Sequence, residues 1–551
     1  MSGEMDVYGM FFTQEAYDRF QLSKEEIELL REKEQEQQKE EGSEEDQDKS
    51  EKTIEDIKIN LDDIWERKER LTIHSSDLSD ATLSADTDQL FYLASVEKGE
   101  DLWVTDYRTK ETKILAKNVG DNASDLILDR ENDKLYVLAD GSIISVDAKS
   151  GERSQVNVRG EMTLYPAQER EYIFEHVWRQ VKKKFYDPDL HGVDWEFYKK
   201  EYAKFLPHIN NNHDFSEMLS EMLGELNGSH TGSRYGHQEP YGDQTASLGV
   251  FYDRSFQGPG LKVAEVIENG PSDKADSQIS QGTIITGIDG NTLTDGENVY
   301  RHLNRKAGER VLLSLENPEN GENWEEVIKP ISGSKESDLL YKRWVEQNRQ
   351  KVNELSDGTI GYVHVRGMND SSYRTVFEEV LGKNAQKEAI VVDTRFNGGG
   401  WLHEQLATFL SGEPYIKFAP REKRLGTEPM QKWSKPSAVL VSEGNYSDAH
   451  MFPYAYRSKD LGKIIGMPVP GTGTAVWWEQ QIDPTLVFGI PQVGMLTPEG
   501  EYLENNQLQP DIVLDNRPEQ LLQGIDQQLR KAVEVLEKEA QSESNPFETN
   551  N

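Results

Sequence analysis

The 551-residue sequence predicts a multidomain protein that combines β-rich segments with segments of mixed α/β class. Two observations support this prediction. Short strands of alternating polarity fill the stretch from Ile57 to about Val158, whereas strands and helices alternate over residues 337–540. The length corresponds to roughly three or four ordinary domains. We therefore expect several folding units rather than one continuous core.

Composition limits the partners and the chemistry. Asp and Glu outnumber Lys and Arg by 100 to 61, which gives a net charge of −39. Such a charge repels phosphate backbones, so no nucleic-acid partner is expected, and it favours cationic peptides over acidic ones. The absence of cysteine excludes disulfides, thiolate metal sites and a cysteine nucleophile. No cluster of metal ligands and no phosphate-binding loop stands out, so we expect no metal and no other cofactor.

The sequence also limits the compartment. No apolar stretch is long enough to cross a bilayer, so no membrane span is expected. The N-terminus lacks the basic and apolar regions of a signal peptide. We therefore expect a cytoplasmic protein, or a periplasmic one if a signal peptide lies upstream of this chain.

The first 160 residues divide into two parts. Residues 1–60 are acidic, and the charged run from Ser23 to Lys58 has no apolar stripe, which predicts a solvated helix or a partly disordered insertion. Residues 61–160 repeat a strand–turn–strand pattern with a period of about 40 residues, which is typical of β-propeller blades. Because propellers close with four to eight blades, the two blades predicted here form an incomplete propeller. We infer that the chain is the C-terminal part of a longer protein.

Residues 161–243 are predicted to be helical. Apolar residues follow helical spacing up to Phe185, and Asp187-Pro188 ends that helix. A second helix is predicted to begin with Asp214 as its N-cap and to end at Asn227-Gly228, a common C-cap pair. Ser229 and His230 follow immediately.

Residues 244–333 predict a compact β-rich domain. Strands are expected at residues 261–266 and 282–288, and Gly270-Pro271-Ser272 is expected to open a helix between them. This succession resembles a PDZ domain, which binds an extended peptide as an added strand. The alternative is a module that only packs against its neighbours as a lid.

Residues 334–540 predict a layered α/β domain with parallel strands. Apolar strands are expected at residues 358–365, 389–393 and 437–441, with helices at 371–381, 401–410 and 448–457. A last helix is expected from Pro518 to about Glu539. Residues 541–551 are predicted to be a disordered tail.

Ser447 lies where the third of these strands ends and a helix begins. That position exposes a hydroxyl and directs the following backbone N–H groups outward, where they could hold an oxyanion. The alternative is that Ser447 is an ordinary helix N-cap. Asn397-Gly398-Gly399-Gly400 also connects a buried strand to a helix, and its glycines allow a ligand to approach the backbone closely.

A serine nucleophile needs a base and an acid. His230 follows a helix C-terminus, where the helix dipole favours an imidazolium ion. Glu504 precedes a predicted strand at residues 509–513. Taken alone, His230 could be an ordinary loop histidine, and Glu504 is one acid among many.

Together, these motifs resemble the tricorn protease family, which are serine peptidases related to the C-terminal processing peptidases. The resemblance covers roughly residues 80–540. It rests on the propeller-like strands, the helical segment ending in GELNGSH, the PDZ-like module, and the sequences DTRFNGGG, YSDAHMFP and LENN. The resemblance implies a crotonase-like catalytic domain, peptide or unfolded-protein substrates, and a homo-oligomer, which is a hexamer in the archaeal type. The upstream propellers of the family are almost wholly absent here.

The resemblance also implies a catalytic tetrad and an oxyanion hole. In this sequence the matching tetrad residues are Ser447 as nucleophile, His230 as general base, Glu504 as the terminal acid and Ser229 as the hydroxyl that connects or orients them. The matching oxyanion donors are the N–H of Asp448 and that of Gly399 or Gly398, with Gly399 preferred.

Two alternatives remain open on the sequence. A Ser–Lys C-terminal processing protease needs a lysine about two dozen residues after the serine. Residues 471–477 contain none, and Lys463 comes too early. The second alternative is a catalytically inactive PDZ scaffold that only binds peptides, which the retained Ser, His, Glu and glycine turn disfavour.

Overall fold

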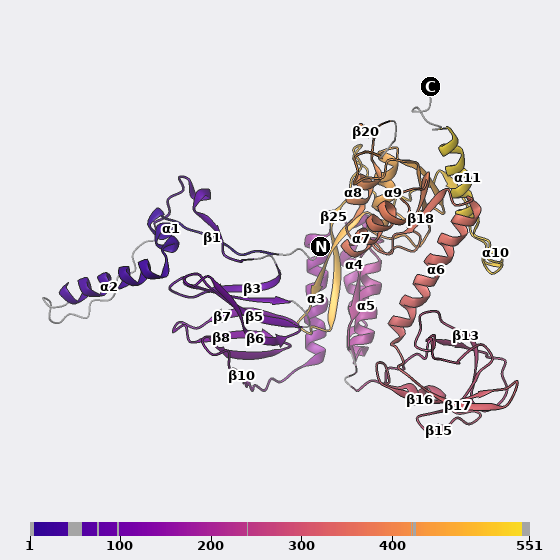
Figure 1. Ribbon diagram of the computed structural model, residues 1–551, viewed down its shortest axis with the longest axis horizontal. Helices are drawn as coiled ribbons and strands as arrows, with labels where there is room; N and C mark the ends of the chain where they lie inside the picture. The colour runs from indigo at the N-terminus through magenta and orange to yellow at the C-terminus, as the bar shows by residue number, and fades with distance from the viewer. Residues whose placement is uncertain are drawn as a thin grey trace. The chain divides into compact units, whose positions relative to one another are not determined.

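A computed structural model describes residues 5–41, 58–73, 76–95, 99–237, 239, 241–419, 421 and 426–542. The chain divides into two compact units, Met1–Thr163 and Leu164–Asn551, coloured indigo to magenta and magenta to yellow in Figure 1. Each unit has hydrophobic cores of its own. The mixed α/β class predicted from the sequence is confirmed, with antiparallel sheets in both units.

The first unit begins with a small two-stranded sheet and two helices. β1 (Tyr8–Met10) pairs with β2 (Lys68–Arg70), and α1 (Gln14–Gln21) precedes α2 (Lys24–Glu41). Ile27 of α2 is buried, so the charged helix is anchored by its first turn. The part of the predicted insertion at residues 42–57 lies outside the described residues.

Two four-stranded antiparallel sheets complete this unit. Within each sheet, strands that are consecutive in sequence are neighbours. Buried residues of both sheets, including Leu93, Leu102, Leu135 and Val146, form one core. The strands are β3 (Asp77–Leu83), β4 (Gln89–Ser95), β5 (Glu100–Asp106), β6 (Glu111–Gly120), β7 (Ala123–Leu128), β8 (Lys134–Ala139), β9 (Ser142–Asp147) and β10 (Arg153–Val156).

The second unit begins with helices that pack on strands from much later in the chain. The helices are α3 (Pro166–Lys184), α4 (Trp195–Ala203) and α5 (Asn212–Gly224). Their core includes Phe174 and Leu223 and extends to Phe488 and Ile490. Those two residues lie on β25 (Leu486–Gly494), the central strand of a sheet with β11 (Gly232–Tyr235) and β24 (Thr474–Gln480). This packing holds the segment after α5 against β25.

Local capping in this segment differs from the prediction. Asn211 is the N-cap of α5, because its side chain accepts a hydrogen bond from the N–H of Asp214 at 2.9 Å. The predicted cap, Asp214, therefore lies inside the first turn. The helix dipole favours an acidic residue in the first turn, and an Asp is also common at the N-cap. The residue type of Asp214 therefore could not distinguish the N-cap from the first turn.

The β-rich region contains one sheet of six strands. Five of them lie side by side in the order β12 (Val250–Tyr252), β13 (Leu261–Val266), β14 (Ile284–Ile288), β16 (Val311–Asn317) and β17 (Glu322–Ile328). The sixth strand, β15 (Asn291–Thr292), pairs with β14. The helix predicted to open at Gly270 is wrong, because residues 270–277 form turns, a bend and irregular backbone. The Ser272 hydroxyl donates a buried hydrogen bond to the Leu248 carbonyl at 2.7 Å, which ties this segment to the sheet instead of capping a helix.

A five-stranded parallel sheet forms the centre of the α/β region, and its predicted parallel pairing is confirmed. The strand order is β18 (Ile360–His364), β19 (Ala389–Asp393), β22 (Ser437–Val441), β23 (Gly462–Gly466) and β26 (Ile512–Val513). One face packs on α7 (Asp370–Glu378), α8 (His403–Leu410) and α9 (Asp448–Ser458). The other face packs on α6 (Gly333–Leu355) and α11 (Gln527–Ser542). Covering both faces explains why these strands are continuously apolar.

The predicted C-terminal helix is interrupted. α10 (Pro518–Leu521) and α11 are separate, because Gly524 takes a positive φ of 77° between them. Leu522, next to this break, is 89% exposed. The predicted disordered tail falls almost entirely on residues 543–551, outside the described residues. Among the helices of the described ranges, none is long and apolar enough to cross a membrane.

Candidate active site

Ser447 occupies a strained turn between β22 and α9. Its φ of 56° and ψ of −124° are sparsely populated for a residue with a side chain, and such a conformation costs about 1–3 kcal/mol. The side chain makes no capping hydrogen bond, although the residue stands at the N-cap position. Instead, the backbone N–H of Ser447 donates to Thr472 Oγ1 at 2.7 Å. Within the described part of the chain, Ser447 Oγ has no hydrogen-bond partner and is thus available for other chemistry.

A buried asparagine fixes this turn. The Asn445 side chain accepts from the Ser442 N–H at 3.0 Å, and it donates to Thr394 Oγ1 at 3.0 Å and to the Ala449 carbonyl at 3.3 Å. That carbonyl would normally bond to the N–H four residues later, which is Pro453 and has none. Asn445 therefore supplies the donor that the proline lacks, which lets α9 start rigidly behind Ser447.

Glu504, Ser229 and His230 form a continuous hydrogen-bonded relay. Glu504 is buried, with 3% of its surface exposed. Its carboxylate accepts from the Ser229 N–H at 2.5 Å and from the Ser229 hydroxyl at 2.8 Å, although 275 residues separate the two in sequence. Ser229 Oγ also lies 2.8 Å from His230 Nδ1. The structure therefore brings together these three residues from two distant segments.

The direction of these bonds determines the tautomer of His230. Because the Ser229 hydroxyl donates its hydrogen to Glu504, its oxygen is left to accept from an Nδ1–H of His230. Thr474 Oγ1, at 3.0 Å from both Ser229 Oγ and His230 Nδ1, lies beside the same bond. With the proton on Nδ1, the lone pair of a neutral imidazole is on Nε2. That lone pair is what a general base requires.

Tyr446 connects this relay to the serine turn. The His230 N–H donates to the Tyr446 hydroxyl at 2.7 Å, and the two rings are 4.8 Å apart between centroids. Ser447 follows Tyr446 directly. No hydrogen bond joins His230 to Ser447 Oγ among the residues described.

Burial shifts the pKa values of both ends of the relay. Burial lowers the pKa of His230, which favours the neutral imidazole. Burial also raises the pKa of the Glu504 carboxyl, while the two bonds from Ser229 act in the opposite direction. The acid is thus a desolvated group whose charge depends on these donors.

The glycine turn lies against the serine turn. Gly399 has a φ of 96°, and a Cβ at this position would lie 2.6 Å from Ser447 Cβ and 3.1 Å from the Asp448 nitrogen. Its own N–H donates to Asn397 Oδ1 at 2.8 Å. The N–H groups of Gly398 and Asp448 have no acceptor within the described ranges.

The Asp448 carboxylate holds the two turns together. This side chain is fully buried and accepts from the N–H groups of Leu402 and His403 at 2.5 and 3.0 Å, at the start of α8. His403 Nδ1 is 2.5 Å from the same carboxylate. A carboxylate at a helix N-terminus is electrostatically favourable. The bonds lock α8, which follows the glycine turn, to α9, which follows Ser447.

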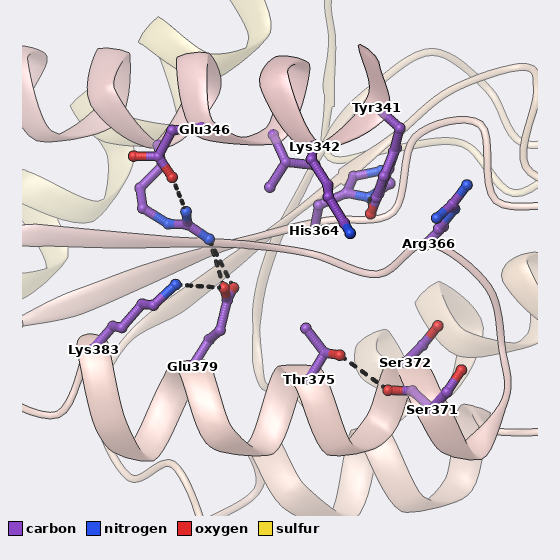
Figure 2. A pocket seen from close by; sticks show the side chains of 12 residues that line it. Tyr341, Lys342, Glu346, His364, Arg366, Ser371, Ser372, Thr375, Glu379 and Lys383 are labelled. Carbon is purple, nitrogen blue, oxygen red and sulfur yellow. Dashed lines mark hydrogen bonds and ion pairs between the residues drawn. The ribbon is translucent and has the colours of Figure 1, made fainter. Parts of the chain in front are cut away.

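A separate cavity of about 410 Å³ lies between α6 and α7 (Figure 2). Arg349 contacts Glu346 and lies 2.8 Å from Glu379, and Lys383 is 3.1 Å from Glu379. These cations are therefore already paired with carboxylates. Across the described residues, no group of three or more His, Asp and Glu side chains is arranged to hold a metal ion.

Two family profiles match this chain. The Tricorn protease C1 domain matches residues 166–224, and Peptidase family S41 matches residues 359–514. The second match contains the glycine turn, Ser447 and Glu504, and His230 lies just beyond the first. These matches show that the chain is similar to peptidases. Within this class, the chain is related to the tricorn proteases.

Several known proteins that resemble this chain are longer than it. The chain is 25% identical over 470 residues to a putative Tricorn-like protease C-terminal subunit of Sulfurisphaera tokodaii, covering 80% of this chain and 52% of that protein. It is 24% identical to the tricorn protease of Thermoplasma acidophilum, covering 81% and 42%. A crystal structure of the tricorn protease superposes with a TM-score of 0.74 at 22% identity, over 89% of this chain and 49% of the other, which establishes a shared fold. The chain spans about half the length of these relatives.

Sequence reasoning missed several neighbours of the site. Tyr446, Thr472, Thr474 and Asn397 were not singled out, although each makes a hydrogen bond within or beside it. Their adjacency to Ser447 or to the glycine turn was a signal for Tyr446 and Asn397. The two threonines had none, because their contacts depend on how the segment after β23 folds back.

Proposed function

We propose that this chain is a tricorn-type serine peptidase that hydrolyses peptides or unfolded polypeptides through an acyl-enzyme. Ser447 is the nucleophile, His230 the general base, and Ser229 and Glu504 complete a Ser–His–Glu–Ser tetrad. The observation that carries the proposal is the relay from Glu504 through Ser229 to His230 Nδ1, which leaves Nε2 as the basic nitrogen beside the serine turn. Peptide substrates are also the chemistry that the names of the relatives indicate.

In the first step, Ser447 Oγ attacks the carbonyl carbon of the scissile bond while His230 Nε2 accepts the hydroxyl proton. The imidazolium that forms is stabilised through Ser229 by the Glu504 carboxylate. The carbonyl π electrons move onto oxygen, and the resulting oxyanion needs two aligned donors. His230 then gives its proton to the departing amine, which leaves an ester on Ser447. Water, deprotonated by His230, attacks the ester carbonyl; the bond to Ser447 Oγ then breaks, His230 returns its proton to that oxygen, and the acid product is released.

The Asp448 N–H is one oxyanion donor in this proposal. For the second, we propose Gly398 in preference to Gly399. The Gly399 N–H already donates to Asn397 Oδ1, whereas the Gly398 N–H has no acceptor within the described chain. Gly399 has a different role, because the absence of its side chain lets the two turns meet.

The decisive experiment is covalent labelling. A fluorophosphonate should add one adduct to the intact chain, and peptide mapping should locate it on Ser447. Ser447→Ala should lose both the adduct and peptide hydrolysis while keeping its thermal unfolding profile. Ser458→Ala, at the exposed end of the same helix, is the matched control and should keep both. Full hydrolysis by Ser447→Ala would refute the nucleophile assignment.

The alternatives predict other results. A Ser–Lys enzyme that used Lys463 as its base would lose activity in Lys463→Ala. Because Lys463 is exposed on β23, we expect this variant to keep the wild-type rate. An inactive scaffold would bind peptides without turnover or labelling. The strained backbone of Ser447, and a hydroxyl with no partner among the described residues, favour a catalytic role over a scaffold.

Further assignments rest on the resemblance together with the sheets described above. We propose that the two four-stranded sheets of the first unit are blades of an incomplete β-propeller, that residues 244–333 are a PDZ-like domain, and that residues 334–540 form a crotonase-like catalytic domain. β12 supports the second assignment, because it lies at a sheet edge, where an extended peptide can add a strand. A homo-oligomer, hexameric as in the archaeal type, and a cytoplasmic location are also proposed. Mass photometry and cell fractionation test these two properties.

A further inference from the structure

An arginine beside the proposed site stacks on a tryptophan. Arg234 is exposed on β11, and its guanidinium carbon lies 3.8 Å from the centre of the Trp478 ring on β24. The two residues come from opposite edges of one sheet, with β25 between them. In the register of that sheet, Gly232 and Trp478 both lie opposite Gly489. Because Gly489 has no side chain, the Trp478 ring can lie across the central strand to reach Arg234.

This pair is adjacent to the catalytic histidine. A Cβ on Gly489 would lie 2.5 Å from the His230 carbonyl oxygen and 2.9 Å from the Trp478 ring. The ring and the His230 backbone therefore meet over the same glycine. Burial is the main cause that raises the pKa of the Tyr446 hydroxyl. The positive charge of Arg234 lies close enough to this hydroxyl to oppose that rise. Arg234 thus lies on the side of His230 that also contacts the serine turn.

The guanidinium of Arg234 has no acidic partner among the described residues. In the part of the chain that the structure describes, the Arg234 guanidinium has no ion pair and no hydrogen bond, although acidic residues outnumber basic ones by 100 to 61. Arginines elsewhere in this unit, such as Arg349 and Arg395, are paired with carboxylates. Stacking covers one face of the guanidinium and leaves its N–H edges open. A planar edge of this kind binds a carboxylate through two parallel hydrogen bonds.

We propose that Arg234, held flat by Trp478, forms a subsite that binds a carboxylate of the substrate. This inference rests on the proposed peptidase function and specifies which peptides the site selects. The carboxylate is either the C-terminal group of a short peptide or the side chain of Asp or Glu near the scissile bond. With a net charge of −39, the protein disfavours anionic peptides at long range. The Arg234 guanidinium reverses that preference at one position of the substrate.

Four peptides, made as two pairs that each differ in one group, distinguish the two sources of the carboxylate. One pair carries a free or an amidated C-terminus, and the other carries Glu or Gln beside the scissile bond. For the wild-type protein, we expect kcat/KM to be about 10-fold higher for the charged member of one pair, which corresponds to about 1.4 kcal/mol. In Arg234→Gln the ratio should fall to about one, mainly through KM. Trp478→Leu should reduce it in part, since the guanidinium is then free to rotate.

The matched control is Arg530→Gln, which removes one exposed arginine of α11 and the same charge. This variant should keep the wild-type ratio. Equal kcat/KM values for both members of both pairs in the wild type would overturn the inference, as would an unchanged ratio in Arg234→Gln. Thermal unfolding of the Arg234 variant shows whether its fold is intact.

A binding measurement separates this inference from the proposed function. Fluorescence anisotropy with the same four peptides, labelled at the N-terminus, is measured on Ser447→Ala. Preferential binding of a charged peptide that is lost in the Ser447→Ala, Arg234→Gln double variant supports the subsite, even if the wild type hydrolyses nothing and the peptidase function fails. Hydrolysis without any preference for a carboxylate in either assay refutes the subsite alone.

Discussion

Replacing Glu504 by Gln should reverse the hydrogen bonds of the relay and place the imidazole proton on the wrong nitrogen. Glu504 accepts two bonds from Ser229, one from its N–H and one from its hydroxyl. A glutamine can accept only with its carbonyl oxygen. If that oxygen keeps the Ser229 N–H, the amide group faces the Ser229 oxygen and donates to it. The Ser229 hydroxyl then donates to His230 Nδ1, and the proton of the neutral ring moves to Nε2.

A ring with its proton on Nε2 cannot accept the proton of Ser447. The loss is limited by Thr474 Oγ1, which lies 3.0 Å from His230 Nδ1 and can accept from an Nδ1–H in place of Ser229. We therefore expect kcat to fall about 100- to 1,000-fold, or about 3–4 kcal/mol in activation free energy. The two side chains are nearly isosteric, so the free energy of unfolding should change by only about 1 kcal/mol.

The assay is steady-state hydrolysis of a fluorogenic peptide, with thermal unfolding of the same samples. Glu501→Gln is the matched control, because Glu501 is exposed three residues earlier and should keep wild-type kcat. Ser447→Ala should lose more activity than Glu504→Gln, since the acid orients the base and does not attack the substrate. A kcat for Glu504→Gln within threefold of the wild type would refute the relay as the determinant of the tautomer.

Three further predictions follow from the same geometry. Since burial lowers the pKa of His230 and the base works when neutral, kcat/KM should fall with decreasing pH at a midpoint below 6.5. His450, which is buried behind the serine turn, has its pKa lowered to about 4. Between pH 6.5 and 4, the unfolded chain therefore binds a proton at His450 that the folded chain does not. As the pH falls through this window, the contribution of His450 to the free energy of unfolding decreases by about 3 kcal/mol. Denaturant unfolding at several pH values should show this dependence, and His450→Asn should weaken it; an identical slope in the variant would contradict the assignment. Gly399→Ala should lower both the melting temperature and kcat, because its Cβ meets neighbouring atoms at 2.6–2.7 Å and its φ is positive, whereas Gly398→Ala has free space and should keep the melting temperature.

The sequence by itself determined the local features of this protein. Continuous apolar runs predicted the strands at residues 389–393 and 437–441, because strands covered on both faces need apolar side chains at every position. The turns after them were also predictable, since Ser447 and the glycines stand where strand pattern gives way to helix pattern. Motif order then suggested the family, which the comparisons support.

Only the tertiary structure decided what lies next to what. Glu504 and Ser229 are 275 residues apart, and no local pattern specifies which of the many acids is buried against that hydroxyl. The same holds for the position of Arg234 on Trp478, which depends on the register of β25 between them. The break at Gly524 also escaped sequence analysis, because a helical apolar spacing continues across it. Periodicity reports the faces of single elements, whereas a hydrogen-bonded site depends on distances between elements that packing alone sets.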